Sequence, residues 1–292
     1  MSAPGLKRKP SWFKINRLAV GERASAVLNA VAQNELHTVC TSASCPNKGT
    51  CFAEGTATFM ILGDLCTRAC RFCNIDTGRP AAEDLEEGER VAAAAAKMGL
   101  RFVVVTSVCR DDLSDEGAAA FSRTIRALHR AIPGVQVEVL TPDFSGREDC
   151  IRTVLEAGPH VFNHNLETVE RLTPSIRTKA RYHRSLSVLK KVRELAPSLP
   201  TKSGLMVGLG ESRGELRQSF ADLASAGVAR LTIGQYLQPT RLHHPVLRYY
   251  EPEEFVEMGE EAKAAGIPLV LSGPLVRSSY HAGGFVGAGT SD

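Results

Sequence analysis

The sequence predicts an α/β protein built as a partial (β/α) TIM-like barrel. From about Thr56 onward a helical stretch repeatedly ends at a glycine, and an apolar, β-branched run follows at once. The runs are short and nearly continuously hydrophobic, as strands buried on both faces should be. A full eightfold barrel typically takes ~250 residues, which indicates that this barrel is incomplete. The glycines suit the left-handed position that closes a helix; they are Gly99, Gly158, Gly227 and Gly266.

About seven strands are expected to alternate with the helices. In chain order they lie in "TATFMIL", "RFVVVTS", "VQVEVL", "HVFNHN", "TKSGLMVGL", "VARLTIGQY" and "IPLVLSG". A doubly wound open sheet is the competing architecture, but "GLMVGLGESRGE" is only a loose glycine-rich strand end and not a dinucleotide fingerprint. Residues 1–55 do not follow the alternation, so we expect them to form an N-terminal extension before a barrel of residues 56–272.

Composition limits the partners and the compartment. The 292 residues are 43 % hydrophobic and 23 % charged, with a formal net charge of +3. This is a globular composition whose mild charge predicts no nucleic-acid partner. No apolar run approaches the ~20 residues of a membrane helix, and the first twenty residues lack the apolar core of a secretory signal. They also lack acidic residues, which leaves a short organellar transit peptide open. We expect a cytoplasmic protein, in which clustered cysteines indicate metal binding or catalysis rather than disulfides.

Six of the eight cysteines form two triplets near the N-terminus. Their spacings are C-x4-C-x5-C and C-x3-C-x2-C, and neither set contains a histidine. Structural zinc takes four ligands, commonly in C-x2-C pairs or with histidines, so zinc is disfavoured. Three thiolates on a four-iron cluster leave one iron for another ligand, and we therefore expect two such clusters. The triplets are Cys40, Cys45 and Cys51, followed by Cys66, Cys70 and Cys73.

The second triplet resembles the signature of the radical SAM superfamily. It directly follows the first barrel strand in "TFMILGDLC", and Phe72 stands beside its last cysteine. The resemblance implies that Cys66, Cys70 and Cys73 hold a [4Fe–4S] cluster whose open iron binds S-adenosylmethionine. By the same resemblance, one electron would then cleave the sulfonium to give a 5′-deoxyadenosyl radical, which would remove hydrogen from an unactivated carbon.

Nearly the whole chain is similar to the lipoyl synthase family. The motifs that carry this resemblance follow the family's order: "SCPN", "GTATFMILGDLCTRACRFC", "TSVCRDDL", "NHNLETV", "TKSGLMVGLGE", "GQYLQPT" and "GPLVRSSYHA". The resemblance implies that a second, auxiliary [4Fe–4S] cluster is held by Cys40, Cys45, Cys51 and a serine of the R-S-S-Y motif in the C-terminal segment 273–292. Ser279 is the expected ligand, in preference to Ser278. This cluster would donate two sulfur atoms to C6 and C8 of an octanoyl chain on a carrier-protein lysine.

The resemblance also implies partners. The carriers would be lipoyl domains of 2-oxoacid dehydrogenase E2 subunits and the glycine cleavage H protein, and the electron donor a ferredoxin or flavodoxin. Two rival functions remain at this stage. A methylthiotransferase would need an additional module for which the chain has little length, and a two-cluster electron carrier would not need polar strand ends or a large barrel.

The motif "NHNLETV" supplies candidate ligands for S-adenosylmethionine. If the strand stays extended, Asn163, Asn165 and Glu167 share one face, since residues two apart in a strand point the same way. A polar strand end turning into a helix is the alternative. The resemblance implies that Asn165 and Glu167 lie near S-adenosylmethionine. Arg177 could bind the carboxylate of S-adenosylmethionine.

Other polar residues are expected to be structural. We interpret His160 and His164 in this way, and reject His243 and His244 as a metal pair because neighbouring side chains rarely converge on one ion. Cys109 and Cys150 are interpreted as packing residues. Two interpretations of Arg110, Asp111 and Asp112 weigh evenly. They could bind the methionine amino group, or they could form a hydrogen-bonded loop that leads to Asp115 as a helix cap. Lys202 and Ser203 are expected to support the strand that they begin.

Overall fold

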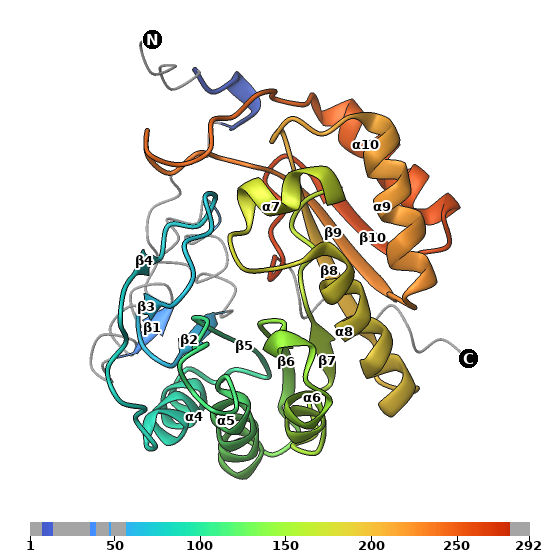
Figure 1. The fold of residues 1–292 in the computed structure, drawn as a ribbon. Helices are drawn as coiled ribbons and strands as arrows, with labels where there is room; N and C mark the ends of the chain where they lie inside the picture. The colour runs from blue at the N-terminus through green and yellow to red at the C-terminus, as the bar shows by residue number, and fades with distance from the viewer. Residues whose placement is uncertain (1–7, 14–35, 39–46, 48–56, 281–292) are drawn as a thin grey trace.

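The computed structural model describes residues 8–13, 36–38, 47 and 57–280. Their main sheet has eight strands in the order β1-β2-β5-β6-β7-β8-β9-β10 (Figure 1). Only β1 (His37–Thr38) is antiparallel to its neighbour, and the seven strands that follow it in the sheet are parallel. The order places β1 and β10 at the two edges, so the sheet is a barrel that does not close.

The seven parallel strands are the seven predicted ones, and the partial (β/α) barrel is confirmed. Their bounds are β2 (Thr58–Ile61), β5 (Phe102–Ser107), β6 (Gln136–Leu140), β7 (Val161–Asn163), β8 (Thr201–Val207), β9 (Arg230–Gln235) and β10 (Leu269–Gly273). A second, two-stranded sheet pairs β3 (Leu65–Cys66) with β4 (Asp76–Thr77). It lies in the connection between β2 and the first long helix.

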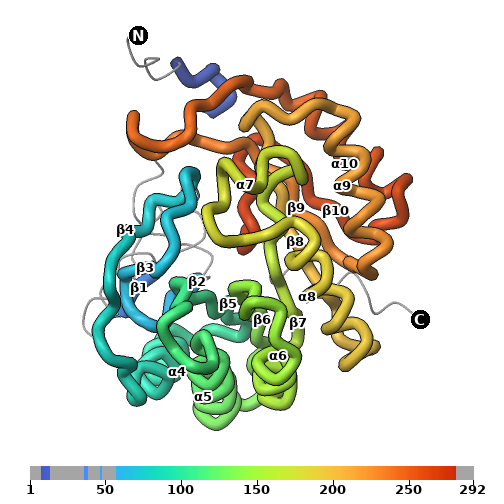
Figure 2. Tube along the Cα trace, viewed as in Figure 1, coloured from blue at the N-terminus to red at the C-terminus, as the bar shows by residue number. Residues whose placement is uncertain are grey.

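Helices follow one another around the convex side of the sheet (Figures 1 and 2). The long ones are α4 (Glu87–Lys97), α5 (Ala118–Ala131), α6 (Glu148–Leu155), α8 (Tyr182–Leu195), α9 (Arg213–Ser225) and α10 (Pro252–Ala264). Shorter turns are η1 (Ser11–Phe13), η2 (Phe144–Gly146), η3 (Glu170–Leu172) and α7 (Thr173–Ile176). The four predicted glycines follow helices at positive φ, with values of 64° at Gly99, 79° at Gly158, 76° at Gly227 and 105° at Gly266, which confirms their role as helix terminators.

Most of the parallel strands have an apolar outer face and an inner face that carries buried polar residues. Phe59, Val105 and Val137 belong to one hydrophobic cluster beneath the helices, and Leu205 and Ile233 belong to another. The alternate positions, which face the other way, include buried polar residues; these are Thr58, Thr106, Glu138, Asn163, Lys202, Arg230 and Thr232. The helices therefore seal the outside of the sheet, and the concave interior is left for polar chemistry.

Part of the predicted extension belongs to the barrel sheet. His37 and Thr38 pair with Met60 and Phe59 of β2, so this stretch lengthens the sheet by one strand. Further upstream, the ring of Phe13 lies 5.4 Å from that of Tyr249. In the described part of the chain no helix has the length and apolarity needed to cross a membrane.

Candidate functional site

The cysteine loop, residues 66–73, lies at the carboxyl ends of the parallel strands. It follows β2 and is held by backbone hydrogen bonds to the loops after β5 and β7. The Thr67 amide donates to the Cys109 carbonyl at 3.1 Å, and the Arg71 amide donates to the Ile176 carbonyl at 2.8 Å. From the loop after β9, the His244 amide donates to the Arg71 carbonyl at 2.8 Å. This end of a (β/α) barrel is where active sites are found.

The three thiols of this loop have different environments. The Cys66 sulfur accepts the backbone N–H groups of Arg68 and Cys109, each at 3.4 Å. A hydrogen bond from the Cys109 side chain, these two amides and the charge of Arg68 lower the pKa of Cys66 to about 6 against the effect of burial. Burial raises the pKa of Cys70, and raises that of Cys73 to about 12. Cys66 is therefore the thiol most readily present as a thiolate, the form that binds metal.

The donor set fits an iron–sulfur cluster better than a single ion. Within the described ranges no three histidine, cysteine or acidic side chains converge closely enough to hold one metal ion. A four-iron cluster does not need such convergence, because each thiolate binds a different iron. The thiols of Cys66, Cys70 and Cys73 are nevertheless close enough for their charges to affect one another's pKa values.

Arg68, between the first two cysteines of the loop, connects the loop to two neighbouring strand ends. Its Nη2 atom lies 2.6 Å from Asp111 Oδ1 and 2.8 Å from Asp143 Oδ1, and its side chain is 4 % exposed. Lys179 also contacts Asp111, at 3.1 Å. The structure thus places Asp111 in an ion-pair network that fixes the loop. Arg68 was not predicted from the sequence, although a charged residue between two proposed cluster ligands is a signal of such a role.

The other residues of the "TSVCRDDL" motif stabilise its loop. Arg110 Nη2 lies 2.9 Å from Asp112 Oδ2. The carboxylate of Asp115 accepts the amides of Gly117 at 3.1 Å and Ala119 at 2.7 Å at the start of α5, as a helix-capping residue does. These contacts favour the hydrogen-bonded loop over a role in binding the methionine amino group. The interpretation of Cys109 as a packing residue was wrong, because its amide and side chain contact Cys66, whereas Cys150 is buried as expected, at 2 % exposure.

The "NHNLETV" motif divides into two groups. The shared face of Asn163, Asn165 and Glu167 was expected only if the strand stays extended. It does not, because β7 ends at Asn163 and Glu167 adopts a positive φ of 68°. Asn163 Nδ2 donates to Glu138 Oε1 at 2.9 Å inside the barrel. Asn165 Nδ2 instead donates to Glu167 Oε1 at 3.1 Å, and burial raises the pKa of the Glu167 carboxyl. Asn165 Oδ1 is buried without a hydrogen-bond partner among the described residues.

Arg177 follows α7 and is buried next to the cysteine loop. Its Nη1 atom donates to the Leu166 carbonyl at 3.2 Å and to Ser185 Oγ at 3.0 Å, while its Nε atom finds no partner within the described part of the chain. The positive charge of Arg177 opposes the desolvation that raises the pKa of Cys70, which puts the two side chains near one another. Phe72 is half-buried and packs on the second hydrophobic cluster.

The histidines have structural contacts, as predicted. His164 Nδ1 lies 2.9 Å from the Thr141 carbonyl and its Nε2 lies 2.9 Å from Ser185 Oγ, while burial lowers its pKa to about 4. His160 Nδ1 accepts the Val137 amide at 3.1 Å. The ring of His243 contacts the Cys73 carbonyl at 2.9 Å, and that of His244 contacts the Leu209 carbonyl at 3.0 Å. The last two rings therefore bond to different backbone carbonyls.

The C-terminal segment reaches the same site from β10. Ser278 Oγ accepts Asn165 Nδ2 at 2.7 Å, and the Leu275 carbonyl accepts Asn47 Nδ2 at 2.6 Å. Asn47 is two residues beyond Cys45 in the chain. The predicted ligands Cys40, Cys45 and Cys51 lie outside the described residues. The segment that carries Ser278 and Ser279 thus contacts both Asn165 and a residue next to the upstream triplet.

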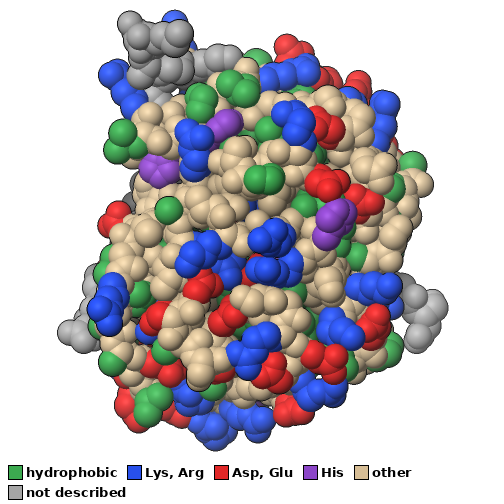
Figure 3. Space-filling model, in the orientation of Figure 1, with side chains coloured by type: hydrophobic (Ala, Val, Ile, Leu, Met, Phe, Trp, Pro, Cys, Tyr) green, Lys and Arg blue, Asp and Glu red, His purple; other side chains and the backbone are tan. Residues whose placement is uncertain are grey.

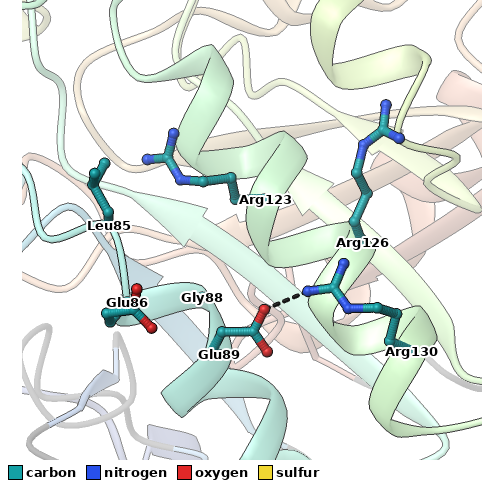
Figure 4. Close-up of a pocket in the computed structure, with 7 residues that line it drawn as sticks. All are labelled: Leu85, Glu86, Gly88, Glu89, Arg123, Arg126 and Arg130. Carbon is teal, nitrogen blue, oxygen red and sulfur yellow. Dashed lines mark hydrogen bonds and ion pairs between the residues drawn. The ribbon is translucent and has the colours of Figure 1, made fainter.

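A pocket elsewhere on the molecule has a different character (Figure 4). It lies on the outer surface, where the start of α4 faces α5, and three arginines of α5 line it: Arg123, Arg126 and Arg130. Arg130 pairs with Glu89 of α4, and Arg123 pairs with Glu83. Charges of both signs are also interspersed over the face in Figure 3. The pocket therefore reflects charge pairing between surface helices and is not part of the candidate site.

The chain is similar in sequence to known proteins. The profile of the radical SAM superfamily matches residues 60–223. The lipoyl synthase of Rubrobacter xylanophilus is 53 % identical over 278 residues, covering 95 % of this chain and 86 % of that protein. The lipoyl synthase of Shouchella clausii is 50 % identical over 276 residues, covering 94 % of this chain and 89 % of that protein.

Solved structures share the fold at low sequence identity. Streptococcus suis SuiB bound to S-adenosylmethionine aligns with a TM-score of 0.58 and 11 % identity, over 77 % of this chain and 54 % of that one. The FeFe-hydrogenase maturase HydG from Carboxydothermus hydrogenoformans aligns with a TM-score of 0.54 and 11 % identity, over 85 % of this chain and 70 % of that one. At such identities these likenesses establish the architecture alone.

Proposed function

The chain belongs to the lipoyl synthase family of the radical SAM superfamily, and on that premise we propose which of its residues carry out the family's reaction. That reaction is the S-adenosylmethionine-dependent insertion of two sulfur atoms at C6 and C8 of an octanoyl chain on a carrier-protein lysine. The cofactors are S-adenosylmethionine and [4Fe–4S] clusters, of which the auxiliary one supplies the sulfur.

Cys66, Cys70 and Cys73 are the proposed ligands of the radical-generating cluster. They lie on one loop at the carboxyl ends of the strands, and the lowered pKa of Cys66 favours a thiolate. When bound, the cluster supplies the electron that cleaves S-adenosylmethionine to a 5′-deoxyadenosyl radical. The protein's part is to hold the loop rigid, through Arg68 and the backbone bonds to neighbouring loops, and to exclude water from the reacting groups.

Asn165, Glu167, Arg177 and Phe72 are the proposed contacts of S-adenosylmethionine. Asn165 Oδ1 and Arg177 Nε are buried polar atoms without partners among the described residues, and such atoms need a ligand to satisfy them. The guanidinium of Arg177 suits the methionine carboxylate. Glu167 is held by Asn165, at 3.1 Å, in a left-handed backbone conformation that a glutamate adopts only at a cost, and such strain is characteristic of functional sites.

Cys40, Cys45, Cys51 and Ser279 are the proposed ligands of the auxiliary cluster. The contact of Asn47 with Leu275 supports this, because it joins the stretch that follows Cys45 to the C-terminal segment. Ser278 is already engaged by Asn165, and the Ser279 hydroxyl has no partner among the described residues. In this proposal residues 1–55 carry the triplet, residues 56–272 form the barrel, and residues 273–292 bring the serine.

We also propose the carrier substrates, the electron donor and the cellular location of this protein. Enzymes of this family act on lipoyl carrier proteins. We infer that the substrates are octanoylated E2 lipoyl domains and glycine cleavage H protein, and that a ferredoxin or flavodoxin supplies electrons. A cytoplasmic location suits a chain with this many thiols, since thiols remain reduced there.

One observation carries the assignment of residues. Asn165 donates both to Ser278 of the C-terminal segment and to Glu167, whose charge influences Cys70 of the cysteine loop. The test is anaerobic incubation of reconstituted protein with S-adenosylmethionine, a reductant and an octanoyl-lysine peptide, followed by mass spectrometry. We expect a gain of two sulfurs and a loss of two hydrogens per octanoyl group, together with 5′-deoxyadenosine.

Two cysteine variants test whether the proposed triplet is responsible for radical formation. Cys66→Ala should abolish both products, whereas Cys150→Ala, at a buried position within α6, should retain both. If Cys66→Ala still formed 5′-deoxyadenosine, the assignment of the radical-generating triplet would be wrong. If the unmodified protein formed 5′-deoxyadenosine but left the peptide unchanged, the peptide would not represent the substrate.

A further inference from the structure

The C-terminal segment lies directly over two glycines in the middle of barrel strands. A Cβ atom at Gly234 of β9 would lie 2.1 Å from the Val276 carbonyl oxygen. A Cβ atom at Gly204 of β8 would lie 3.0 Å from Ser278 Oγ and 2.8 Å from Asn165 Oδ1. At Gly234 the contact is with backbone and is too short for any real Cβ atom, so the segment could not take this path over another residue type there. At Gly204 the neighbouring side-chain ends would have to shift.

Space, and not backbone conformation, explains the two glycines. Neither Gly204 nor Gly234 has a positive φ. A glycine inside a strand costs roughly 0.5–1 kcal/mol relative to alanine, and it often marks a place where another stretch of backbone approaches closely. At Gly234 the approaching backbone is that of Val276, and at Gly204 the approaching atom of the segment is the Ser278 hydroxyl oxygen.

Three further contacts fix the segment at this place. Asn165 Nδ2 donates to Ser278 Oγ at 2.7 Å across a sequence separation of 113 residues. The amide of Val276 donates to the Gly273 carbonyl at 3.1 Å, and its side chain is buried at 6 % exposure. Together the glycines and Asn165 form a continuous receiving surface on β8, β9 and the end of β7, which we call the docking groove.

We propose that the docking groove, formed by Asn165, Gly204 and Gly234, positions the C-terminal segment, and that Ser278 is the positioning residue that fixes Ser279 toward the auxiliary cluster. The final step of this proposal rests on the proposed function of Ser279. The two adjacent serines then have different tasks. Ser278 attaches the segment to the barrel, and Ser279 is left available as a ligand.

The groove also connects the two proposed cofactor sites. Asn165 contacts Ser278 and Glu167 with the same amide nitrogen, at 2.7 Å and 3.1 Å. Moving the segment out of the groove therefore removes a hydrogen bond from the residue that we assign to S-adenosylmethionine. Displacing the segment should accordingly be detectable both at the auxiliary site and in S-adenosylmethionine binding.

Limited proteolysis tests docking without reference to activity. Trypsin cuts after arginine, and the bond after Arg277 lies inside the segment, so mass spectrometry of the reconstituted holoenzyme can follow that one cleavage. Proteolysis of this kind reports the population of the open form. We expect Gly234→Ala to be cut about tenfold faster or more, since a loss of ~1.4 kcal/mol of docking energy is a factor of ten.

Gly214→Ala is the matched control, because a Cβ atom at Gly214 in α9 meets nothing within 4 Å. It should be cut at the unmodified rate. If Gly234→Ala fails to fold, Gly204→Ala replaces it, since its added carbon meets only ends of side chains. Cleavage of a folded glycine variant at the unmodified rate would overturn the docking groove.

Two serine variants separate this proposal from the assignment of the cluster ligand. Ser278→Ala should raise hydrogen exchange in residues 276–280 and weaken S-adenosylmethionine binding, and should also change the Mössbauer spectrum of the auxiliary cluster. Ser279→Ala should change that spectrum while exchange and proteolysis stay at unmodified levels. If Ser279→Ala left the spectrum unchanged while Gly234→Ala still opened the segment, the groove would stand and the proposed ligand would be wrong. Unchanged exchange in Ser278→Ala would exclude Ser278 as the positioning residue.

Discussion

Arg68 shows how a single residue controls the cysteine loop. Its backbone N–H donates to the Cys66 sulfur, while its buried guanidinium pairs with Asp111 and Asp143 from the loops after β5 and β6. Hydrogen bonds to cluster sulfurs and nearby charges are the main means by which proteins adjust the reduction potential of an iron–sulfur cluster. Arg68 contributes both, and we therefore expect it to affect the cluster as well as the fold.

Replacing Arg68 tests this directly. Arg68→Gln removes a cation beside Cys66 and should lower the midpoint potential of the radical-generating cluster by tens of millivolts, as measured by redox titration with electron paramagnetic resonance. Arg68→Lys should recover much of the shift, because it keeps the charge. Arg110→Gln is the control, since Arg110 is equally buried but pairs with Asp112. Equal potentials in a folded Arg68→Gln protein and the unmodified one would contradict the prediction.

His164 should make stability depend on pH. Burial lowers its pKa to about 4 from an ordinary value near 6.5. Between these values the unfolded chain binds more protons than the folded one, so stability falls as the pH falls from about 6.5 to about 4. The loss should reach roughly 3 kcal/mol. The charged groups that influence His164 are Arg177, Arg68 and Asp143; the arginines stay charged, and the pKa of Asp143 is held below its usual value by Arg68 despite burial.

The measurement is urea denaturation across this pH range. His164→Gln should flatten the pH dependence of the unfolding free energy, although it lowers stability at neutral pH through the lost hydrogen bonds. His183→Gln, at a surface position on α8, should keep the original slope. A slope in His164→Gln as steep as in the unmodified protein would assign the pH dependence to other groups.

Features that are close in sequence could be predicted, whereas contacts between distant positions could not. The cysteine triplets could be recognised because the members of each are close in sequence, whereas the terminal serines were predicted only through the resemblance to the family. The contacts of Arg68 and Cys109 were not, since they join positions 43 residues apart whose proximity depends on how two strand ends meet. The shared face predicted for Asn163, Asn165 and Glu167 failed because the strand ends earlier than its polar pattern suggests.

At the scale of elements, the strands form a sheet that is apolar outside and charged inside. Glu138 of β6 and Lys202 of β8 are both fully buried, and Lys202 Nζ lies 3.0 Å from Glu138 Oε1. Asn163 of β7, the strand between them, donates to the same oxygen at 2.9 Å. The order of strands follows from the alternating helices and glycines, and was predictable. This cross-strand network was not, because the sequence does not give the register of neighbouring parallel strands.

Breaking the buried pair should destabilise the barrel. Lys202→Met leaves Glu138 without its buried counter-charge and should cost about 3–5 kcal/mol of unfolding free energy. Lys202→Met combined with Glu138→Gln should be less destabilising than Lys202→Met alone. Lys191→Met on α8 is the control, since its pairs with Glu148 and Glu194 are partly exposed to solvent and such pairs are worth ~1 kcal/mol or less each. Urea denaturation measures all four proteins, and a cost for Lys202→Met as small as that for Lys191→Met would refute the argument.

At the scale of the whole molecule, the N-terminal extension and the C-terminal segment both contact the open barrel. The sheet stops at β1 and β10 without closing, so its concave polar face is not sealed by strands alone. The N-terminal extension contributes β1 and Asn47, and the segment after β10 returns over β8 and β9. The Asn47 contact with Leu275 then joins the two ends across 228 residues. This arrangement predicts that the barrel and its C-terminal segment have separable functions.

Truncation after Gly273 tests that separation. The barrel sheet is complete at this residue, and the cysteine loop with its Arg68 network lies within the part that remains. We expect the truncated protein to fold and to form 5′-deoxyadenosine, because the cysteine loop remains. It should bind S-adenosylmethionine more weakly, because Asn165 loses its hydrogen bond to Ser278. Sulfur insertion should be abolished, since the truncation removes both Ser278 and Ser279. Mass spectrometry of the peptide product and chromatography of 5′-deoxyadenosine measure the two outcomes in one reaction.

The Ser279→Ala variant of the untruncated protein is the control. It removes one hydroxyl and leaves the segment docked, so it separates the effect of the serine from that of the whole segment. If both proteins cleave S-adenosylmethionine and neither inserts sulfur, the segment acts through its serine. If the truncated protein alone loses cleavage, the segment is also needed to support Asn165 and the barrel interior, and the two functions are not separable. Sulfur insertion by the truncated protein would show that residues after Gly273 are dispensable, and the proposed auxiliary ligand set would be wrong.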